Sequence, residues 1–248
     1  MTRNFRDSEG TTKAQSSHSA DGDQPVAASG SGILFKDRYL IQEELGRGGT
    51  GIVYMAHDQQ LLSKPVVVKV LLEETGRDPW FKKKFLQEME ALARLDHPGI
   101  VGVLDSGFTP DGNLFLVMQF IKGQNLRGLI RHEGMDLADV ARIVRQIGLA
   151  LTTAHQQNII HCDLKPENIM LQELSSGEQY VKIVDFGVAK IRDSKVASAD
   201  KTKIAGTLAY MAPEQIQGSP SSLSDIYAFA VIAYEMLTGR RPFNVSVY

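Results

Sequence analysis

A glycine-rich segment near the start of the chain limits the folds that the sequence can adopt. The segment Gly46–Gly51 lies between two β-rich runs, Tyr39–Leu45 and Ile52–Ala56, and not between a strand and a helix. A dinucleotide-binding fold would need a helix after the third glycine, so this placement disfavours that fold. Two interpretations stay open: a flexible hairpin turn, or a turn whose backbone N–H groups lie over phosphates because no Cβ intervenes.

The apolar pattern divides the chain into three parts. Residues 1–32 are rich in Ser, Gly, Asp and Thr and have no apolar period, so they predict a disordered leader. Residues 33–122 contain short β-rich runs and one helix, whereas residues 123–248 are mainly helical, which predicts an α+β fold. The predicted strands are Tyr39–Leu45, Ile52–Ala56, Pro65–Leu71, Ile100–Leu104 and Leu114–Ile121, with a turn at residues 109–113.

Three helices are predicted from apolar spacing and capping residues. The first begins after Asp78, with Pro79 at its first position and an apolar stripe that faces the sheet. The second covers Leu137–Gln157 and is capped by Asp136. The third, Ser224–Leu237, has almost no polar face and is therefore predicted to be buried on all sides.

Composition excludes several classes of partner and environment. Lys and Arg number 27 against 29 Asp and Glu, so no overall positive field favours nucleic acid or an anionic membrane. The longest apolar run, Ile226–Tyr234, is far shorter than the ~20 residues that span a bilayer, so no membrane segment is expected. A single cysteine, Cys162, rules out an intrachain disulfide and favours a cytoplasmic location.

Lys69 stands in a strand that is otherwise apolar, Val66–Val70. A lysine there must be paired or solvated, because removing an isolated ammonium from water is costly. One interpretation is an edge lysine that reaches solvent. The other is an ion pair with the following helix, where Glu88 lies beside the apolar stripe, while Glu90 points roughly 160° away toward solvent.

Two further segments combine hard oxygen ligands with a lysine. The loop His161–Asn168 contains Asp163, Lys165 and Asn168, and Asp185 follows the strand-like run 180–184. Asn168 and Asp185 suit Mg²⁺, which keeps its other positions for water and phosphate, and the lack of thiolate or clustered His ligands disfavours zinc. Each segment alone could be a polar turn, but their order after Lys69 makes coincidence a poor explanation.

Taken in order, these motifs resemble the eukaryotic-type (Hanks-type) serine/threonine protein kinase family, in a bacterial-like form, over residues 39–243. The resemblance rests on the glycine loop, the Val-Val-Val-Lys strand, the His-Cys-Asp-Leu-Lys-Pro-Glu-Asn loop, Asp-Phe-Gly, and the segment Gly206–Glu214. It implies a bilobal fold with an N-lobe at 33–122 and a C-lobe at 123–248. It also implies transfer of the γ-phosphoryl group of ATP to a Ser or Thr hydroxyl of a protein.

The resemblance also implies a role for each site residue. Asp163 would receive the substrate hydroxyl, Lys165 and Thr207 look like the serine/threonine version, and Ser224-Asp225 resembles the family's anchor for the catalytic loop. Asn168 and Asp185 would hold Mg²⁺, with Mn²⁺ as an alternative. The residues implied in catalysis are Asp163, Lys165, Lys69 and Glu88, and those implied in ATP binding are Gly46, Gly48, Gly51, Val53, Val67, Lys69, Met118, Gln119, Ile121 and Met170.

The sequence departs from the family pattern in two places. Cys162 replaces the usual arginine before the catalytic aspartate, so the chain lacks a planar fork for an activation-loop phosphate. We therefore expect activity to depend little on phosphorylation of Ser194, Ser198 or Thr202, although Lys190 keeps a second basic position. Cys162 itself is expected to be a small packing residue, with a redox role as the alternative.

The second departure is that the given chain stops at Tyr248, so the C-lobe is expected to lack its last helices. This early stop and Cys162 favour the alternative of a pseudokinase that binds nucleotide or acts as a scaffold. The intact set of Lys69, Glu88, Asp163, Asn168 and Asp185 favours the enzyme. A small-molecule kinase is a third interpretation. It is disfavoured because the segment Gly206–Glu214 resembles a loop that docks a peptide substrate. The expected partners are ATP and a protein substrate, and the sequence does not specify an oligomeric state.

Overall fold

A computed structural model describes residues 33–48, 51–71, 79–186 and 208–243. Within the first helix, the side chains of residues 79–82, 84, 85 and 88 are not described. The predicted leader at 1–32 lies outside the described residues, as do Lys190 and the three expected phosphorylation positions. In the described part of the chain, no helix is long and apolar enough to cross a membrane.

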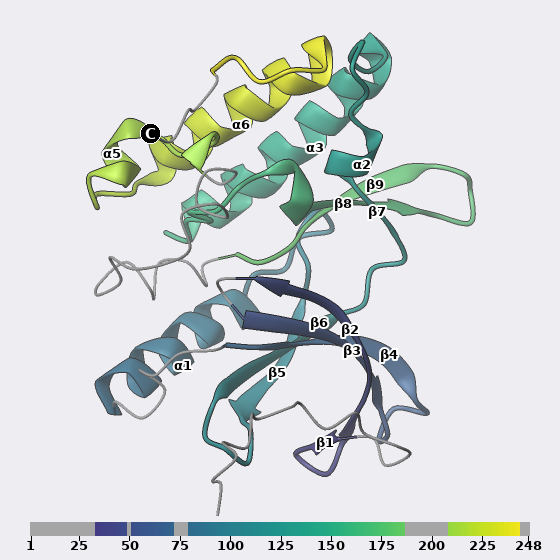
Figure 1. Cartoon of the computed structure of the whole chain (residues 1–248), viewed down its shortest axis with the longest axis vertical. Helices are drawn as coiled ribbons and strands as arrows, with labels where there is room; N and C mark the ends of the chain where they lie inside the picture. The colour runs from purple at the N-terminus through teal and green to yellow at the C-terminus, as the bar shows by residue number, and fades with distance from the viewer. Residues whose placement is uncertain (1–32, 49–50, 72–78, 187–207, 244–248) are drawn as a thin grey trace, which may run out of the picture. The chain divides into compact units, whose positions relative to one another are not determined.

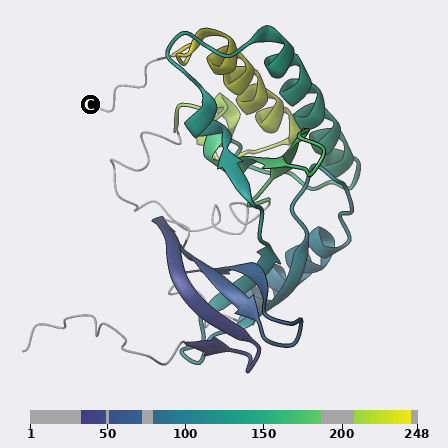
Figure 2. The ribbon, with the colours of Figure 1, turned by 90° about the vertical axis from the view of Figure 1, so that its right-hand side faces the viewer.

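The first part of the chain forms an antiparallel sheet with the strand order β1-β2-β3-β4-β6-β5. Figures 1 and 2 show these strands as a curved layer, with helix α1 (Pro79–Ala93) against it. The strands are β1 (Leu34–Phe35), β2 (Tyr39–Gly48), β3 (Gly51–Asp58), β4 (Lys64–Val70), β5 (Val103–Phe108) and β6 (Leu114–Gln119). The predicted strands at 39, 52, 65 and 114 are therefore confirmed, and β4 lies in the interior of the sheet, between β3 and β6.

The predicted strand at Ile100–Leu104 is wrong in its position. The strand β5 begins at Val103, whereas Ile100 makes only an isolated bridge with Ile183. The N–H of Val101 donates to the carbonyl of Ile183 at 2.9 Å. Ile100 and Val101 are buried against β9 (Gln179–Ile183). Their apolar side chains therefore indicate burial, and they do not indicate pairing with β6, since that pairing begins at Val103.

The second part is mainly helical and carries a small sheet with the order β7-β8-β9. Its other strands are β7 (Gly123–Asn125) and β8 (Ile169–Glu173), and its helices are α2 (Leu126–Leu129), α3 (Leu137–Gln156), η2 (Pro166–Asn168), α5 (Pro213–Ile216) and α6 (Ser222–Thr238). Helices α3 and α6 lie side by side (Figure 1). The prediction of α3 is confirmed, including its cap, since the side chain of Asp136 accepts from the N–H of Ala138 at 2.8 Å.

Helix α6 differs from its prediction in two respects. It begins at Ser222, because Ser221 and Ser224 form a capping box around its first turn. One face is buried through Ala228, Val231, Ile232 and Met236, but Ile226, Tyr234 and Leu237 are 46%, 43% and 48% exposed. The prediction of burial on all sides is therefore wrong for the residues that the structure describes, because the described elements pack on only one side of the helix.

One apolar core connects the large sheet with the helical part. It includes Leu116 and Met118 of β6, Ile183 of β9, Ile147 of α3 and Ile232 of α6. Because these residues pack in a single cluster, the end of β9 is held against the sheet. Asp185 follows β9 by two positions, so this core places it near β4.

Candidate active site

Lys69 forms an ion pair deep in the sheet. The whole residue is 2% exposed, and its Nζ lies 2.8 Å from Oδ2 of Asp185. The edge-lysine interpretation is therefore wrong, since β4 has a neighbour on both sides. Helix α1 contains Glu88, but its side chain lies outside the described residues, so the Lys69–Glu88 pair stays a prediction.

The loop before β8 brings three predicted side chains together. Oδ2 of Asp163 lies 2.8 Å from Nζ of Lys165. The amide nitrogen of Asn168 donates to the backbone carbonyl of Asp163 at 2.8 Å and lies 3.3 Å from Oδ2 of the same residue. The one-turn helix η2, which begins at Pro166, makes this possible because it returns Asn168 toward Asp163.

Backbone contacts join this loop to Asp185. The N–H of Val184 donates to the carbonyl of Asn168 at 2.9 Å, and Nε2 of His161 donates to the carbonyl of Val184 at 2.9 Å. Asp185 has φ +64°, a left-handed conformation that is costly for a residue with a side chain and that concentrates at functional sites. Lys69 thus contacts Asp185, Asn168 contacts Asp163, and the backbone of Val184, the residue before Asp185, joins the two pairs.

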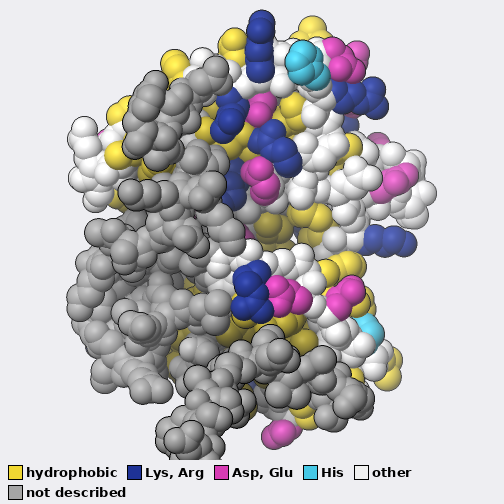
Figure 3. Space-filling model, in the orientation of Figure 1, with side chains coloured by type: hydrophobic (Ala, Val, Ile, Leu, Met, Phe, Trp, Pro, Cys, Tyr) yellow, Lys and Arg dark blue, Asp and Glu magenta, His cyan; other side chains and the backbone are white. Residues whose placement is uncertain are grey.

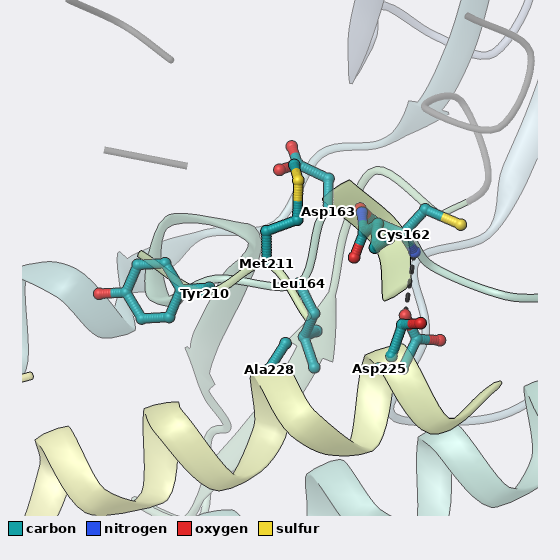
Figure 4. Close-up of a pocket in the computed structure, with 9 residues that line it drawn as sticks. Cys162, Asp163, Leu164, Tyr210, Met211, Asp225 and Ala228 are labelled. Carbon is teal, nitrogen blue, oxygen red and sulfur yellow. Dashed lines mark hydrogen bonds between the residues drawn. The ribbon is translucent and has the colours of Figure 1, made fainter. Parts of the chain in front are cut away.

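Asp225 holds the beginning of the loop from helix α6. It is 1% exposed, and it accepts from the N–H of His161 at 2.8 Å. It also accepts from the N–H of Cys162 at 2.9 Å (Figure 4). Nε2 of His155 lies 2.8 Å from the same carboxylate. The predicted anchor of the loop is therefore confirmed, and it fixes the residues directly before Asp163.

A cluster around Arg127 was not predicted from the sequence. Its guanidinium lies 3.0 Å from Glu167, 2.9 Å from one oxygen of Glu235 and 3.1 Å from the other, and it also donates to the hydroxyl of Tyr210. The hydroxyl of Tyr210 donates to Glu235 at 2.5 Å. Burial, followed by this hydrogen bond, raises the pKa of Tyr210 above its usual range, so the phenol stays protonated.

One signal in the sequence could have indicated this cluster. Glu235 follows the longest apolar run of the chain, and a carboxylate in such a helix needs a partner when it is buried. It is 4% exposed in the structure. Arg127 stands in a short polar segment, where an arginine is ordinary, so no comparable signal marks it in the sequence.

The glycines of the β2–β3 hairpin differ in what the fold demands of them. Gly51 has φ +145°, and a Cβ there would lie 2.1 Å from the carbonyl oxygen of Val70. A Cβ at Gly46 or Gly48 would meet no atom of the described residues within 4 Å. The hairpin is confirmed, and it requires a glycine at 51, whereas it places no steric demand for glycine at 46 and 48.

The remaining predicted ATP-binding residues come from β3, β4, β6, β8 and the segment after β6. Val53 pairs with Lys69, and Val67 pairs with Met118. Met118 and Ile121 are buried, and Val67 and Met170 pack against the core that contains them. The N–H of Gln119 donates to the carbonyl of Gly102 at 3.1 Å.

The balance of charge seen in the composition also holds on one face of the molecule. Figure 3 shows Lys and Arg interspersed with Asp and Glu over the described residues of that face. This arrangement agrees with the absence of an overall positive field.

Comparison with known proteins identifies the family. The protein kinase domain matches residues 39–247, and the chain belongs to the protein kinase family. It is 41% identical over 212 residues to the serine/threonine-protein kinase pkn3 of Myxococcus xanthus, covering 84% of this chain and 39% of the relative. It is 40% identical over 214 residues to the serine/threonine-protein kinase PknB of Mycobacterium tuberculosis, covering 84% of this chain and 33% of the relative.

Solved structures have the same fold. The PknI kinase domain of Mycobacterium tuberculosis matches with a TM-score of 0.68 at 29% identity, over 89% of this chain and 82% of that chain. Rad53 residues 1–466 in complex with AMP-PNP matches with a TM-score of 0.67 at 29% identity, over 85% of this chain and 51% of that chain. The chain therefore has the bilobal α+β protein kinase fold. It spans only about a third of the length of the curated relatives, and their names favour the kinase over the pseudokinase alternative.

Proposed function

We propose that this chain is the catalytic part of a serine/threonine protein kinase, which transfers the γ-phosphoryl group of ATP to a hydroxyl of a protein. The observation that carries the proposal is the set of contacts that joins Lys69, Asp185, Asn168 and Asp163. A lysine, a carboxylate and an amide gathered in this way suit a polyphosphate with a divalent cation. The second carboxylate, Asp163, remains for the acceptor.

The nucleotide would lie between the glycine hairpin and β8. Since no described residue requires glycine at 46 or 48, close approach of a ligand to the backbone would explain their lack of a Cβ. Val53, Val67 and Met170 would contact the adenine faces, and Met118 would limit the depth of the pocket. The carbonyl of Gln119 and the backbone of Ile121 would bind the adenine edge, because the N–H of Gln119 already has a partner. The complex of Rad53 with AMP-PNP supports a nucleotide in this fold.

The donor set fits a hard cation such as Mg²⁺, with Mn²⁺ as an alternative. Both contacts of Asn168 with Asp163 use its amide nitrogen, which leaves the amide oxygen to face a cation, and Asp185 supplies a carboxylate. Bound Mg²⁺ would neutralise phosphate charge during transfer. Among the described residues, no group of three or more His, Cys, Asp or Glu could hold a metal by protein ligands alone, which agrees with a cation that keeps water and phosphate ligands.

Catalysis would depend mainly on orientation and electrostatics. A carboxylate is a weak base toward an alcohol, so Asp163 would aim the hydroxyl and accept its proton late. Lys165, whose Nζ lies 2.8 Å from Asp163, would stabilise the negative charge on the transferred group. Lys69 would bind the α- and β-phosphates and exchange its contact with Asp185 for Glu88.

Cys162 bears on regulation. The residue is 4% exposed, which supports packing over a redox role. Its expected consequence, weak dependence on phosphorylation of the loop, stays a prediction that a phosphatase-treated sample would test. A large loss of activity after dephosphorylation would contradict it.

The test is phosphorylation of a generic protein substrate with labelled ATP and Mg²⁺. We expect incorporation on Ser and Thr, and a loss of at least a hundredfold in the Asp163→Ala variant with ATP affinity retained. Asp139→Ala, at an exposed position in the first turn of α3, is the control for removal of a carboxylate. Equal labelling by the wild type and Asp163→Ala would overturn the proposal in favour of a scaffold.

A further inference from the structure

Gln215 of α5 reaches the backbone of the catalytic loop. Its Nε2 donates to the carbonyl of Cys162, the residue directly before Asp163. Both residues, with Asp163, line a small pocket next to α6. In Figure 4 the carboxylate of Asp163 points away from α6, whereas Asp225 points from α6 toward Cys162. The proposed chemistry of the site does not by itself require a side chain at position 215.

The contact acts on the peptide unit that precedes Asp163. The carbonyl of Cys162 and the N–H of Asp163 belong to one planar unit. Gln215 holds the carbonyl, and Nδ1 of His161 accepts from the N–H of Asp163 at 3.2 Å. Because the two contacts hold opposite edges of the plane, they fix its rotation and hence the backbone from which the Asp163 side chain projects.

This peptide needs to be held, because Cys162 has an unfavourable backbone conformation. Its φ is +64°, a left-handed conformation that is costly for a residue with a side chain. The N–H of Cys162 is held by Asp225 and its carbonyl by Gln215. The adjoining pocket, which Cys162, Asp163 and Gln215 line together, has room for about one water.

Helix α5 is itself attached to α6. The carboxylate of Glu214 accepts from Oγ of Ser224 at 2.8 Å, and the next residue, Gln215, contacts the catalytic loop. Tyr210 and Met211, from the segment before α5, line the same pocket. Consecutive side chains of α5 therefore connect α6 on one side with the catalytic loop on the other.

We propose that Gln215 is a positioning residue, which holds the Cys162–Asp163 peptide so that the carboxylate of Asp163 faces the acceptor hydroxyl. It also connects α5 to the catalytic loop by a link that needs no phosphate. The inference rests on the proposed kinase activity, in which Asp163 orients the acceptor. It predicts a change in turnover and not in nucleotide binding.

The experiment compares the full chain with three variants. Gln215→Met keeps the length of the side chain but removes the donor, and Gln215→Lys restores a donor at its end. Gln217→Met makes the same change as the first variant at an exposed position of the same turn. Protein phosphorylation and ATP hydrolysis are both measured, and rates are expressed per nucleotide-binding site so that an unfolded fraction does not count as lost catalysis.

We expect Gln215→Met to lower kcat for protein phosphorylation about tenfold, with KM for ATP within about twofold and hydrolysis by water less affected. Gln215→Lys should recover most of the loss, and Gln217→Met should match the wild type. A kcat of Gln215→Met within twofold of the wild type, or an equal loss in both Gln215 variants, overturns the inference alone. No labelling above that of Asp163→Ala by the wild type overturns the inference together with the proposed function.

Discussion

The ammonium of Lys69 lies 2.8 Å from the carboxylate of Asp185, although 116 positions separate the two residues. The lysine side chain is 3% exposed and the aspartate side chain 24%. A pair that is buried at one end and open at the other can exchange partners when a charged ligand enters. When nucleotide and Mg²⁺ are bound, the carboxylate of Asp185 would hold the cation, and the ammonium of Lys69 would bind the phosphates.

Asp185→Asn tests the two roles that we assign to this carboxylate, which are to pair with the buried ammonium of Lys69 and to hold Mg²⁺. The variant leaves the buried ammonium without its carboxylate, so we expect the free energy of unfolding to fall by about 1–3 kcal/mol. It should also remove most of the gain in ATP affinity that Mg²⁺ gives the wild type. Calorimetric titration of ATP with and without Mg²⁺, beside a urea melt, measures both effects. Asp111→Asn, at an exposed turn, is the control, and an unchanged Mg²⁺ effect in Asp185→Asn would contradict the assignment.

The glycines of the β2–β3 hairpin allow fold and ligand to be distinguished. Gly51→Ala places a methyl group against the carbonyl of Val70, so we expect a lower melting temperature from a loss of about 2 kcal/mol or more. Gly46→Ala and Gly48→Ala have open space for the methyl group and should melt close to the wild type. These two variants should instead bind ATP about tenfold more weakly, because a Cβ separates the backbone from the phosphates. Wild-type ATP affinity in both would show that the hairpin does not cover a nucleotide.

The Arg127 cluster predicts a strong coupling between α2 and α6. Glu235 is 4% exposed, so Arg127→Met leaves a buried carboxylate that has, among the described residues, Tyr210 as its remaining side-chain partner. We therefore expect a loss of about 3 kcal/mol in the free energy of unfolding. Arg127→Met combined with Glu235→Gln should cost less than the sum of the two single changes, because the unpaired charge is absent. A double-mutant cycle of urea melts measures this coupling, and strict additivity would show that the contacts carry no net energy.

The sequence predicted best what local patterns determine. Asp136 with its apolar stripe located α3, and the motif of the loop before β8 located Asp163 and Asn168, whose side chains contact each other. Contacts between segments that are distant in the sequence could not be predicted in this way. Gln215 and Arg127 have ordinary neighbours in sequence, and their importance comes from segments that only the fold brings near them.

Two predictions were wrong, the strand at Ile100–Leu104 and the burial of Ser224–Leu237 on all sides, because an apolar residue can have more than one structural role. Ile100 is buried near β9, outside the ladder between β5 and β6, and its apolar side chain predicts a strand only because burial and strand formation favour the same residue types. Ile226 is apolar on a face of α6 that no described element covers, so apolarity there does not report burial within the described chain.

His97 predicts a specific dependence of stability on pH. Burial, followed by the positive charge of Lys182, lowers the pKa of His97 below its usual value, against an opposing effect of Asp96. Its Nδ1 accepts from the N–H of Gly99 at 3.0 Å, a contact that the neutral ring can make. The folded state therefore favours the neutral form, and the unfolded chain binds more protons below its ordinary pKa of about 6.5. The stabilisation is complete above that pH and is lost as the pH falls through the lowered pKa.

His97→Asn isolates this contribution, because the amide oxygen of asparagine can accept from Gly99 but does not titrate. We expect the stability of the wild type relative to His97→Asn to fall between pH 7 and pH 5, as measured by urea melts at several pH values. In a Lys182→Met background, the fall should be smaller, since the like charge that lowers the pKa is removed. A relative stability that is constant over this range, or that rises as the solution becomes more acidic, would contradict the neutral assignment of His97.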